Sequence, residues 1–166
     1  YVIASAPNIS TDFYGQVIGK AFKPEETECR NKVVLAPCHG SKSSFMLMHC
    51  AHAALVTSGT ATLETAIMEV PQVVCYAMRC GKAVSWLRGK LLKVPYVSLV
   101  NLIAGREVVP ELVAGDLTQE SLDIALGNVI ANEDFRTRQI QGYRDMMQLL
   151  GMPGAPQKAA EKILEN

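Results

Sequence analysis

Thr57-Ser58-Gly59-Thr60-Ala61-Thr62-Leu63-Glu64 follows an apolar run at 53–56 and leads into a helical pattern, which predicts a strand, a small-residue turn and a helix start. Gly59 lets a ligand approach the backbone, and the unpaired N–H groups of the first helical turn carry the positive end of the helix dipole. With the Ser58 and Thr60 hydroxyls, these groups suit a phosphate. Glu64 lies one helical pitch (~5 Å) further along the axis, where a carboxylate can accept hydrogen bonds from a ribose.

The segments around this stretch alternate between short apolar runs and helical patterns. Such alternation is typical of right-handed parallel crossovers, and it predicts an α/β fold with a Rossmann-like, doubly wound parallel sheet. In sheets of this type, ligands bind beyond the carboxyl ends of the strands. The expected strands are 1–4, 32–36, 53–56, 72–76 and 96–99, and the expected helices between them are 11–22, 42–51, 60–69 and 82–93.

From about residue 118 the pattern is purely helical, which divides the chain into an α/β lobe at 1–117 and C-terminal helices at 118–166. Thr118 is a candidate N-cap, and Gly151 and Pro153 end a second helix. A last helix is expected at 157–164. These helices pack on the lobe, on an absent amino-terminal lobe or on another subunit. Their expected apolar faces comprise Leu122, Ala125, Leu126 and Val129 on the first helix, and Ile140, Tyr143, Met147 and Leu150 on the second.

A second polar segment, 101–107, follows the last expected strand and supplies Asn101, Arg106 and Glu107. A guanidinium can bind a diphosphate bidentately. If this segment shares the carboxyl edge of the sheet with Thr60, the two converge on one ligand. Each segment also has an ordinary interpretation, as an N-capped turn and as a surface ion pair. On the helix, Leu63, Ala66, Ile67 and Val70 form the expected core stripe, beside the Thr60/Glu64 edge.

Composition narrows the function class. Sixteen basic and sixteen acidic residues give zero formal charge, which argues against general nucleic-acid binding. Five cysteines without a Cys-x-x-Cys pair favour reduced thiols and the cytoplasm, and the interrupted apolar stretches favour a soluble domain. The strand expected at residues 1–4 has no initiator Met before it, which suggests a piece of a longer polypeptide. Gly-x-Gly-x-x-Gly and Walker motifs do not occur in the sequence.

Two further clusters have competing interpretations. His49 and His52 lie three residues apart near Cys38, His39 and Cys50, but the spacing fits no familiar metal site, so we expect no metal. The helix expected at 82–93 has a basic face with one aromatic side chain. This face could contact anionic lipid headgroups or simply be solvated. It comprises Arg79, Lys82, Trp86, Lys90 and Lys93.

The segments 54–66, 70–76 and 94–112 together closely resemble the carboxyl-terminal half of lipid-A-disaccharide synthases. The motifs that carry this resemblance are Ala54-Leu55-Val56-Thr57-Ser58-Gly59-Thr60-Ala61-Thr62-Leu63-Glu64, Val70-Pro71-Gln72-Val73-Val74-Cys75-Tyr76 and Asn101-Leu102-Ile103-Ala104-Gly105-Arg106-Glu107-Val108-Val109-Pro110-Glu111-Leu112. The resemblance implies one lobe of a two-lobed GT-B glycosyltransferase. Such an enzyme moves 2,3-diacylglucosamine from its UDP donor to 2,3-diacylglucosamine 1-phosphate (lipid X), without a metal or other cofactor.

By this resemblance, the substrate-binding residues are Ser58, Gly59, Thr60, Glu64, Tyr76, Asn101, Arg106 and Glu107. Arg106 would also stabilise the leaving UDP. The general base would belong to the absent amino-terminal lobe, so this chain alone is expected to be inactive. The resemblance further implies a cytoplasmic enzyme of lipid A and lipopolysaccharide biosynthesis, with peripheral contact to the inner membrane. A homo-oligomer is compatible with it.

The segment 22–44 departs from the family pattern, and residues 1–8 match it only loosely. Two other functions therefore stay open. A UDP-sugar epimerase uses the same helix-end phosphate and ribose contacts, although the long match at 101–112 argues against it. A non-enzymatic UDP-sugar-binding module is the second alternative.

Overall fold

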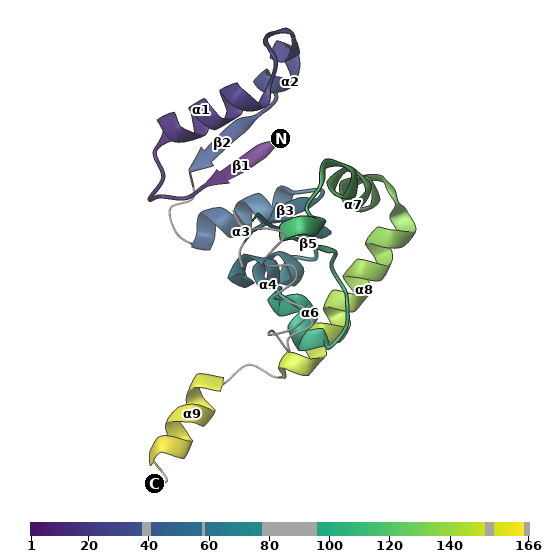
Figure 1. Ribbon diagram of the computed structural model, residues 1–166. Coiled ribbons are helices and arrows are strands. Elements are labelled where there is room, and N and C mark those ends of the chain that lie inside the picture. The colour runs from purple at the N-terminus through teal and green to yellow at the C-terminus, as the bar shows by residue number, and fades with distance from the viewer. Residues whose placement is uncertain (38–40, 58, 78–95, 152–154, 165–166) are drawn as a thin grey trace. The chain divides into compact units, whose positions relative to one another are not determined.

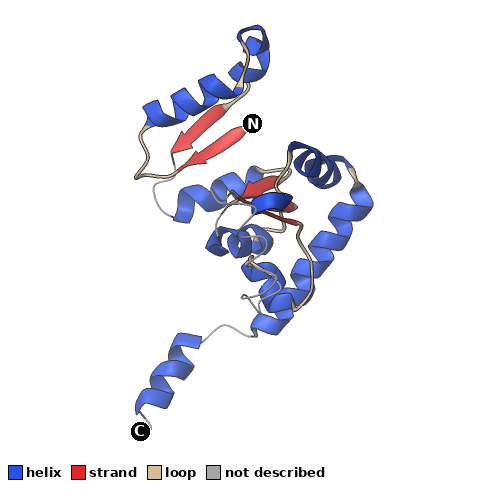
Figure 2. Cartoon of the chain, in the orientation of Figure 1, coloured by secondary structure: helices blue, strands red, loops and turns tan. Residues whose placement is uncertain are grey.

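The computed structural model describes residues 1–37, 41–57, 59–77, 96–151 and 155–164 (Figure 1). The chain forms two compact units, residues 1–51 and 52–166. Both contain parallel strands connected through helices, so the predicted α/β class is confirmed (Figure 2). The two units meet at 51/52, whereas the sequence predicted a boundary at 117/118. The helices Gln119–Ala131 and Glu133–Leu150 contact other elements of the second unit, so they belong to the same unit as its sheet. No described helix is both long and apolar enough to cross a bilayer.

The first unit has a two-stranded parallel sheet of β1 and β2, in which Val2 pairs with Val34. Ser10 caps α1, because its hydroxyl oxygen accepts a hydrogen bond from the backbone N–H of Phe13. The segment 24–31 is helical, where the sequence predicted no element. The elements are β1 Val2–Ser5, α1 Thr11–Ala21, η1 Pro24–Glu26, α2 Thr27–Asn31, β2 Val34–Pro37 and α3 Ser41–Cys50.

The second unit has a three-stranded parallel sheet in the order β3-β4-β5. Val56 pairs with Val74, and Tyr76 pairs with Val113. The elements are β3 Ala54–Val56, α4 Gly59–Ile67, β4 Gln72–Tyr76, α6 Leu99–Ala104, β5 Glu111–Val113, η2 Ala114–Asp116, α7 Gln119–Ala131, α8 Glu133–Leu150 and α9 Ala155–Leu164.

Helices cover both faces of this sheet (Figure 1). Along β4, Val74 faces a cluster formed with α4, α6 and the second half of α8. Val73 and Cys75 face the opposite way, toward α7. The alternation of a period-two strand therefore explains how one strand supplies both cores, and burial in the second raises the pKa of the Cys75 thiol.

The C-terminal helices confirm the predicted caps. The hydroxyl oxygen of Thr118 accepts a hydrogen bond from the backbone N–H of Ser121, and Gly151 ends α8. The buried face of α8 is shifted from the predicted one. Tyr143 is buried as expected, but Met147 and Leu150 are exposed and the buried places belong to Gln139, Gly142 and Met146.

Other expectations for the second unit are wrong. Residues 96–98 form a loop and a helix begins at Leu99, where a strand was predicted at 96–99. The strand β5 at 111–113 was not predicted. On α4, Ile67 is 45% exposed, and Thr62 and Thr65 are buried beside Ala66 instead. The helix expected at 82–93 lies outside the described residues.

Candidate functional site

The N-terminal end of α4 lies at the carboxyl edge of the β3-β4-β5 sheet, because α4 follows β3 after a short turn. Tyr76 ends β4 at the same edge. A Cβ atom added to Gly59 would lie 3.9 Å from the Tyr76 hydroxyl oxygen, so the structure brings these two predicted residues together. Ser58 lies outside the described residues.

The polar side chains of α4 divide into two groups. Thr62 Oγ1 donates to the Gly59 carbonyl at 2.6 Å and Thr65 Oγ1 donates to the Ala61 carbonyl at 2.7 Å, so both hydroxyls are used within the helix. In the described part of the chain, the exposed Thr60 and the half-buried Glu64 make no side-chain hydrogen bond or ion pair. Their spacing of four residues places them on one helix edge, and both remain available to a ligand.

Tyr76 is the other polar group at this edge. Partial burial, together with the negative charge of Glu111, raises the pKa of its phenol above the ordinary value. The phenol therefore stays protonated at neutral pH and can donate a hydrogen bond.

The Asn101 side chain binds other parts of the same chain. The residue is fully buried in α6. Its Nδ2 donates to the Val109 carbonyl and to Glu111 Oε1, each at 2.9 Å, and its Oδ1 accepts from the Val108 and Val109 N–H groups at 2.7 and 3.0 Å. These four bonds use the whole hydrogen-bonding capacity of the amide. These bonds give Asn101 an internal role in the fold, and its direct contact with substrate stays a prediction.

Arg106 and Glu107 lie at the amino edge of the sheet. They follow Gly105, whose φ of +65° ends α6 in the left-handed conformation, and they precede the first residue of β5. Arg106 Nη2 forms an ion pair with Asp145 Oδ2 of α8 at 2.9 Å. The predicted convergence of Arg106 with Thr60 is thus wrong, because α4 begins at the opposite edge. Whether Arg106 or Glu107 contacts substrate stays a prediction.

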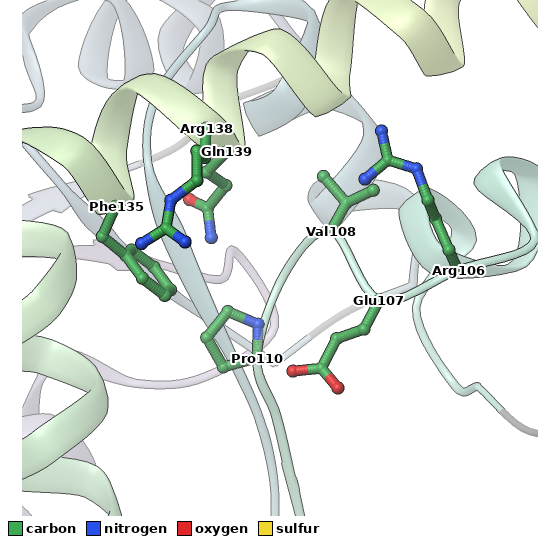
Figure 3. Close-up of a pocket in the computed structure, with 7 residues that line it drawn as sticks. All are labelled: Arg106, Glu107, Val108, Pro110, Phe135, Arg138 and Gln139. Atoms are coloured by element: carbon green, nitrogen blue, oxygen red, sulfur yellow. The ribbon is translucent and has the colours of Figure 1, made fainter.

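A shallow pocket of about 250 Å³ lies between this loop and α8 (Figure 3). The Arg138 guanidinium lies near Phe135 and Pro110, whereas Arg106 points away from them. The side-chain amide of Gln139 is used within the fold. Its Oε1 accepts from the Gln72 N–H, and its Nε2 donates to the Gln72 carbonyl. The two arginines therefore do not converge on one anion. The lining residues are Arg106, Glu107, Val108, Pro110, Phe135, Arg138 and Gln139.

The histidine and cysteine cluster does not gather in the described residues. Within them, no group of three or more His, Cys, Asp or Glu side chains is placed to hold a metal. His52 Nε2 lies 2.9 Å from the Ile130 carbonyl, and Arg136 donates to the His52 carbonyl at 3.0 Å. His52 therefore connects the start of the second unit to the turn between α7 and α8. Cys38 and His39 lie outside the described residues.

Comparison with known proteins agrees with the sequence motifs. A family profile described as "Lipid-A-disaccharide synthetase" matches residues 5–163. The chain belongs to this family. The lipid-A-disaccharide synthase of Myxococcus xanthus is 43% identical over 113 residues, which cover 68% of this chain and 29% of that protein. The synthase of Syntrophus aciditrophicus is 33% identical over 145 residues, which cover 84% of this chain and 37% of that protein.

The lipid-A-disaccharide synthetase match spans every candidate residue from Ser58 to Glu107. The chain covers about 29% of the length of the first relatives it matches. The basic face of Arg79, Lys82, Trp86, Lys90 and Lys93 falls outside the described residues.

Sequence reasoning missed two residues that organise this region, Glu111 and Gln139. Both are polar residues in otherwise helical or apolar patterns, and only their partners in the fold, Ser98 and Gln72 among them, reveal their roles.

Proposed function

We propose that this chain supplies the donor-binding lobe of a glycosyltransferase that joins two acylated glucosamines into the lipid A disaccharide. The observation that carries the proposal is the carboxyl edge of the second sheet, where α4 begins beside the Tyr76 hydroxyl. Thr60 and Glu64 are open to a ligand there. The family match supports the choice of a UDP-sugar as that ligand.

In the proposed complex, the first turn of α4, which begins at Gly59, binds the diphosphate through backbone N–H groups and the Thr60 hydroxyl, and Ser58 is a further candidate contact. The Tyr76 phenol donates from the neighbouring strand. As the bond between sugar and phosphate breaks, negative charge grows on the β-phosphate, and donors that are already oriented stabilise it. Glu64 accepts hydrogen bonds from the ribose.

The proposed reaction also needs two substrates and a second lobe. The donor is UDP-2,3-diacylglucosamine and the acceptor is 2,3-diacylglucosamine 1-phosphate. An amino-terminal lobe provides the general base for the acceptor hydroxyl. The acylated substrates place the enzyme at the cytoplasmic face of the inner membrane, with Lys82 and Trp86 among the candidate contacts.

Calorimetric titration of this chain with UDP in the presence of a chelator tests the donor site. We expect binding without divalent metal, because the helix end already provides a positive potential. Binding that disappears with chelator, or absent binding in either condition, contradicts the proposed site.

The Glu64→Gln variant tests the ribose contact. It should weaken UDP binding by about tenfold, the loss of one charge-assisted hydrogen bond, and it should weaken dUDP binding less, because the deoxyribose offers one hydroxyl fewer. Glu120→Gln, an exposed residue of α7, is the matched control. Equal losses for UDP and dUDP remove Glu64 from this role.

Sugar transfer is tested with the acylated donor and acceptor. We expect no disaccharide from this chain alone, and disaccharide when the chain is joined to an amino-terminal lobe of the family. Product formed by the chain alone overturns the division of labour between the lobes.

A further inference from the structure

The Glu111 carboxylate, at the first residue of β5, accepts hydrogen bonds from a backbone and side-chain network in the described part of the chain. Oε2 accepts from the Val97 N–H at 2.8 Å. Oε1 accepts from the Ser98 N–H at 2.9 Å, from the Ser98 hydroxyl at 2.7 Å and from Asn101 Nδ2 at 2.9 Å. Hydrogen bonds to an ionised acceptor are about twice as strong as neutral ones, so this carboxylate fixes the chain that enters α6.

The bonds continue beyond the carboxylate. Ser98 caps α6 by accepting from the Asn101 N–H at 3.2 Å, and the Asn101 amide holds Val108 and Val109 ahead of β5. One side chain thereby ties the start of α6 to the segment that follows it. Because α6 packs against α4, the network supports the helix whose first turn forms the candidate donor site.

Glu111 also acts on the carboxyl edge directly. On β4 its neighbour is Val74, two residues before Tyr76. Its charge contributes to the raised pKa of the Tyr76 phenol, whose oxygen lies beside Gly59. The carboxylate therefore lies close enough to the Tyr76 phenol for its charge to act on that group, and the phenol in turn lies beside Gly59.

We propose that Glu111 is a positioning residue of the donor site, which holds the start of α6 and the surroundings of Tyr76 in the geometry that binds UDP. This inference rests on the proposed function. Two physical effects of the carboxylate have opposite signs. A bare negative charge near a diphosphate repels it, so an effect of charge alone predicts tighter UDP binding when the charge is removed. A positioning role predicts the opposite, weaker UDP binding when the carboxylate is removed.

The test is UDP calorimetry on the Glu111→Gln variant of this chain. The amide cannot accept at both of its ends, so the Val97 or the Ser98 N–H loses its partner, and UDP affinity should fall about tenfold while the circular dichroism spectrum is kept. Glu120→Gln is the control for loss of one exposed carboxylate. Unchanged or tighter binding by a folded Glu111→Gln variant overturns the proposal.

Ser98→Ala provides a second, milder variant in case Glu111→Gln does not fold. It removes one bond to the carboxylate and should weaken UDP binding about threefold. In the double variant that combines Glu111→Gln with Ser98→Ala, the fold-loss of UDP affinity should be smaller than the product of the two single fold-losses, because both residues act through one network. A folded Ser98→Ala variant with unchanged affinity, or fully multiplicative effects, overturns the proposal.

Ultraviolet titration of tyrosine gives a readout that does not depend on UDP. With Tyr76→Phe to assign the signal, Glu111→Gln should lower the pKa of Tyr76, and an unmoved pKa argues against the proposed role of Glu111 at this edge. If the unchanged chain does not bind UDP, the proposed function falls together with this role. If it binds UDP and Glu111→Gln has no effect, only the role of Glu111 falls.

Discussion

The two edges of the β3-β4-β5 sheet use similar polar residues for different purposes. At the amino edge, Asn101, Gln139 and Arg106 bind other parts of the chain. At the carboxyl edge, Thr60 and Glu64 make no side-chain hydrogen bond or ion pair among the described residues. The residues of the amino edge therefore hold the fold together, and those of the carboxyl edge are free to act on a ligand.

This difference separates two kinds of experimental effect. Substitutions at the amino edge should change the free energy of unfolding, since buried polar groups there lose their partners; within the Glu111 network they should also lower UDP affinity, through the positioning proposed above. Substitutions of Thr60 and Glu64 at the carboxyl edge should change UDP affinity and leave stability nearly unchanged, since neither side chain has a polar partner to lose among the described residues.

The largest effect is expected from Asn101→Ala. The substitution leaves the Val108 and Val109 N–H groups and the Val109 carbonyl without partners in a buried place. We expect a loss of about 3–5 kcal/mol in the free energy of unfolding, measured by urea denaturation. Asn128→Ala, on α7, is the control. A loss within 1 kcal/mol of the control, as an estimate of ordinary surface effects, would contradict the internal role of Asn101.

A smaller loss is expected from Gly142→Ala on α8. A Cβ atom at Gly142 would lie 2.6 Å from Val108 Cγ1, so the packing between α8 and the 105–110 loop must shift. Overpacking of this kind costs about 1–3 kcal/mol, and the gain in helix propensity of up to ~1 kcal/mol offsets part of that cost. Gly127→Ala on α7 is the matched control, because nothing lies within 4 Å of its added Cβ, and helix propensity alone should stabilise it by up to ~1 kcal/mol. Opposite signs for the two variants confirm the close contact.

The sequence predicted local elements well wherever one segment carried its own signal. The strand at 72–76 and the cap at Thr118 depend on local alternation and on a local hydrogen bond, and the structure contains both. It also brings together Gly59 and Tyr76, two residues of the predicted site.

The failure at 96–99 has a non-local cause. Tyr96-Val97-Ser98-Leu99 has the composition of a strand, but Glu111 binds its backbone from 13 and 14 residues away, and Ser98 caps a helix instead. The strand wrongly predicted at 96–99 also led to a wrong placement of Arg106. A segment that follows a parallel strand lies at the carboxyl edge, whereas the same segment after a returning helix lies at the amino edge. Arg106 was therefore assigned to the wrong edge.

A pH-dependent effect is expected at the amino edge from Glu69. Arg144 donates to both of its carboxylate oxygens, at 2.7 and 2.8 Å, and these bonds lower the pKa of Glu69 from its ordinary value. The pair therefore stabilises the fold fully above the unfolded pKa, and this contribution is lost as pH falls through the folded pKa. Both partners are partly exposed, so the effect is small.

The measurement is the unfolding midpoint between pH 6 and pH 3, values that bracket the ordinary carboxylate range. Glu69→Gln should flatten the decline of stability in acid, and Glu120→Gln should not. Identical curves for Glu69→Gln and the unchanged chain would show that the ion pair contributes nothing in solution.

The smallest effect is expected from Arg106→Ala, and it tests the comparison most directly. Its ion pair with Asp145 is half exposed, so the loss of stability should be at most about 1 kcal/mol. UDP affinity should change by less than about twofold. The guanidinium lies at the edge of the sheet opposite the first turn of α4, and solvent screens the interaction between charges on opposite edges. Arg144→Ala, which removes another arginine of the same edge, is the control. If Arg106→Ala instead weakens UDP binding as much as Glu64→Gln does, and Arg144→Ala does not, the donor reaches the amino edge. The separation between a structural edge and a binding edge would then be wrong.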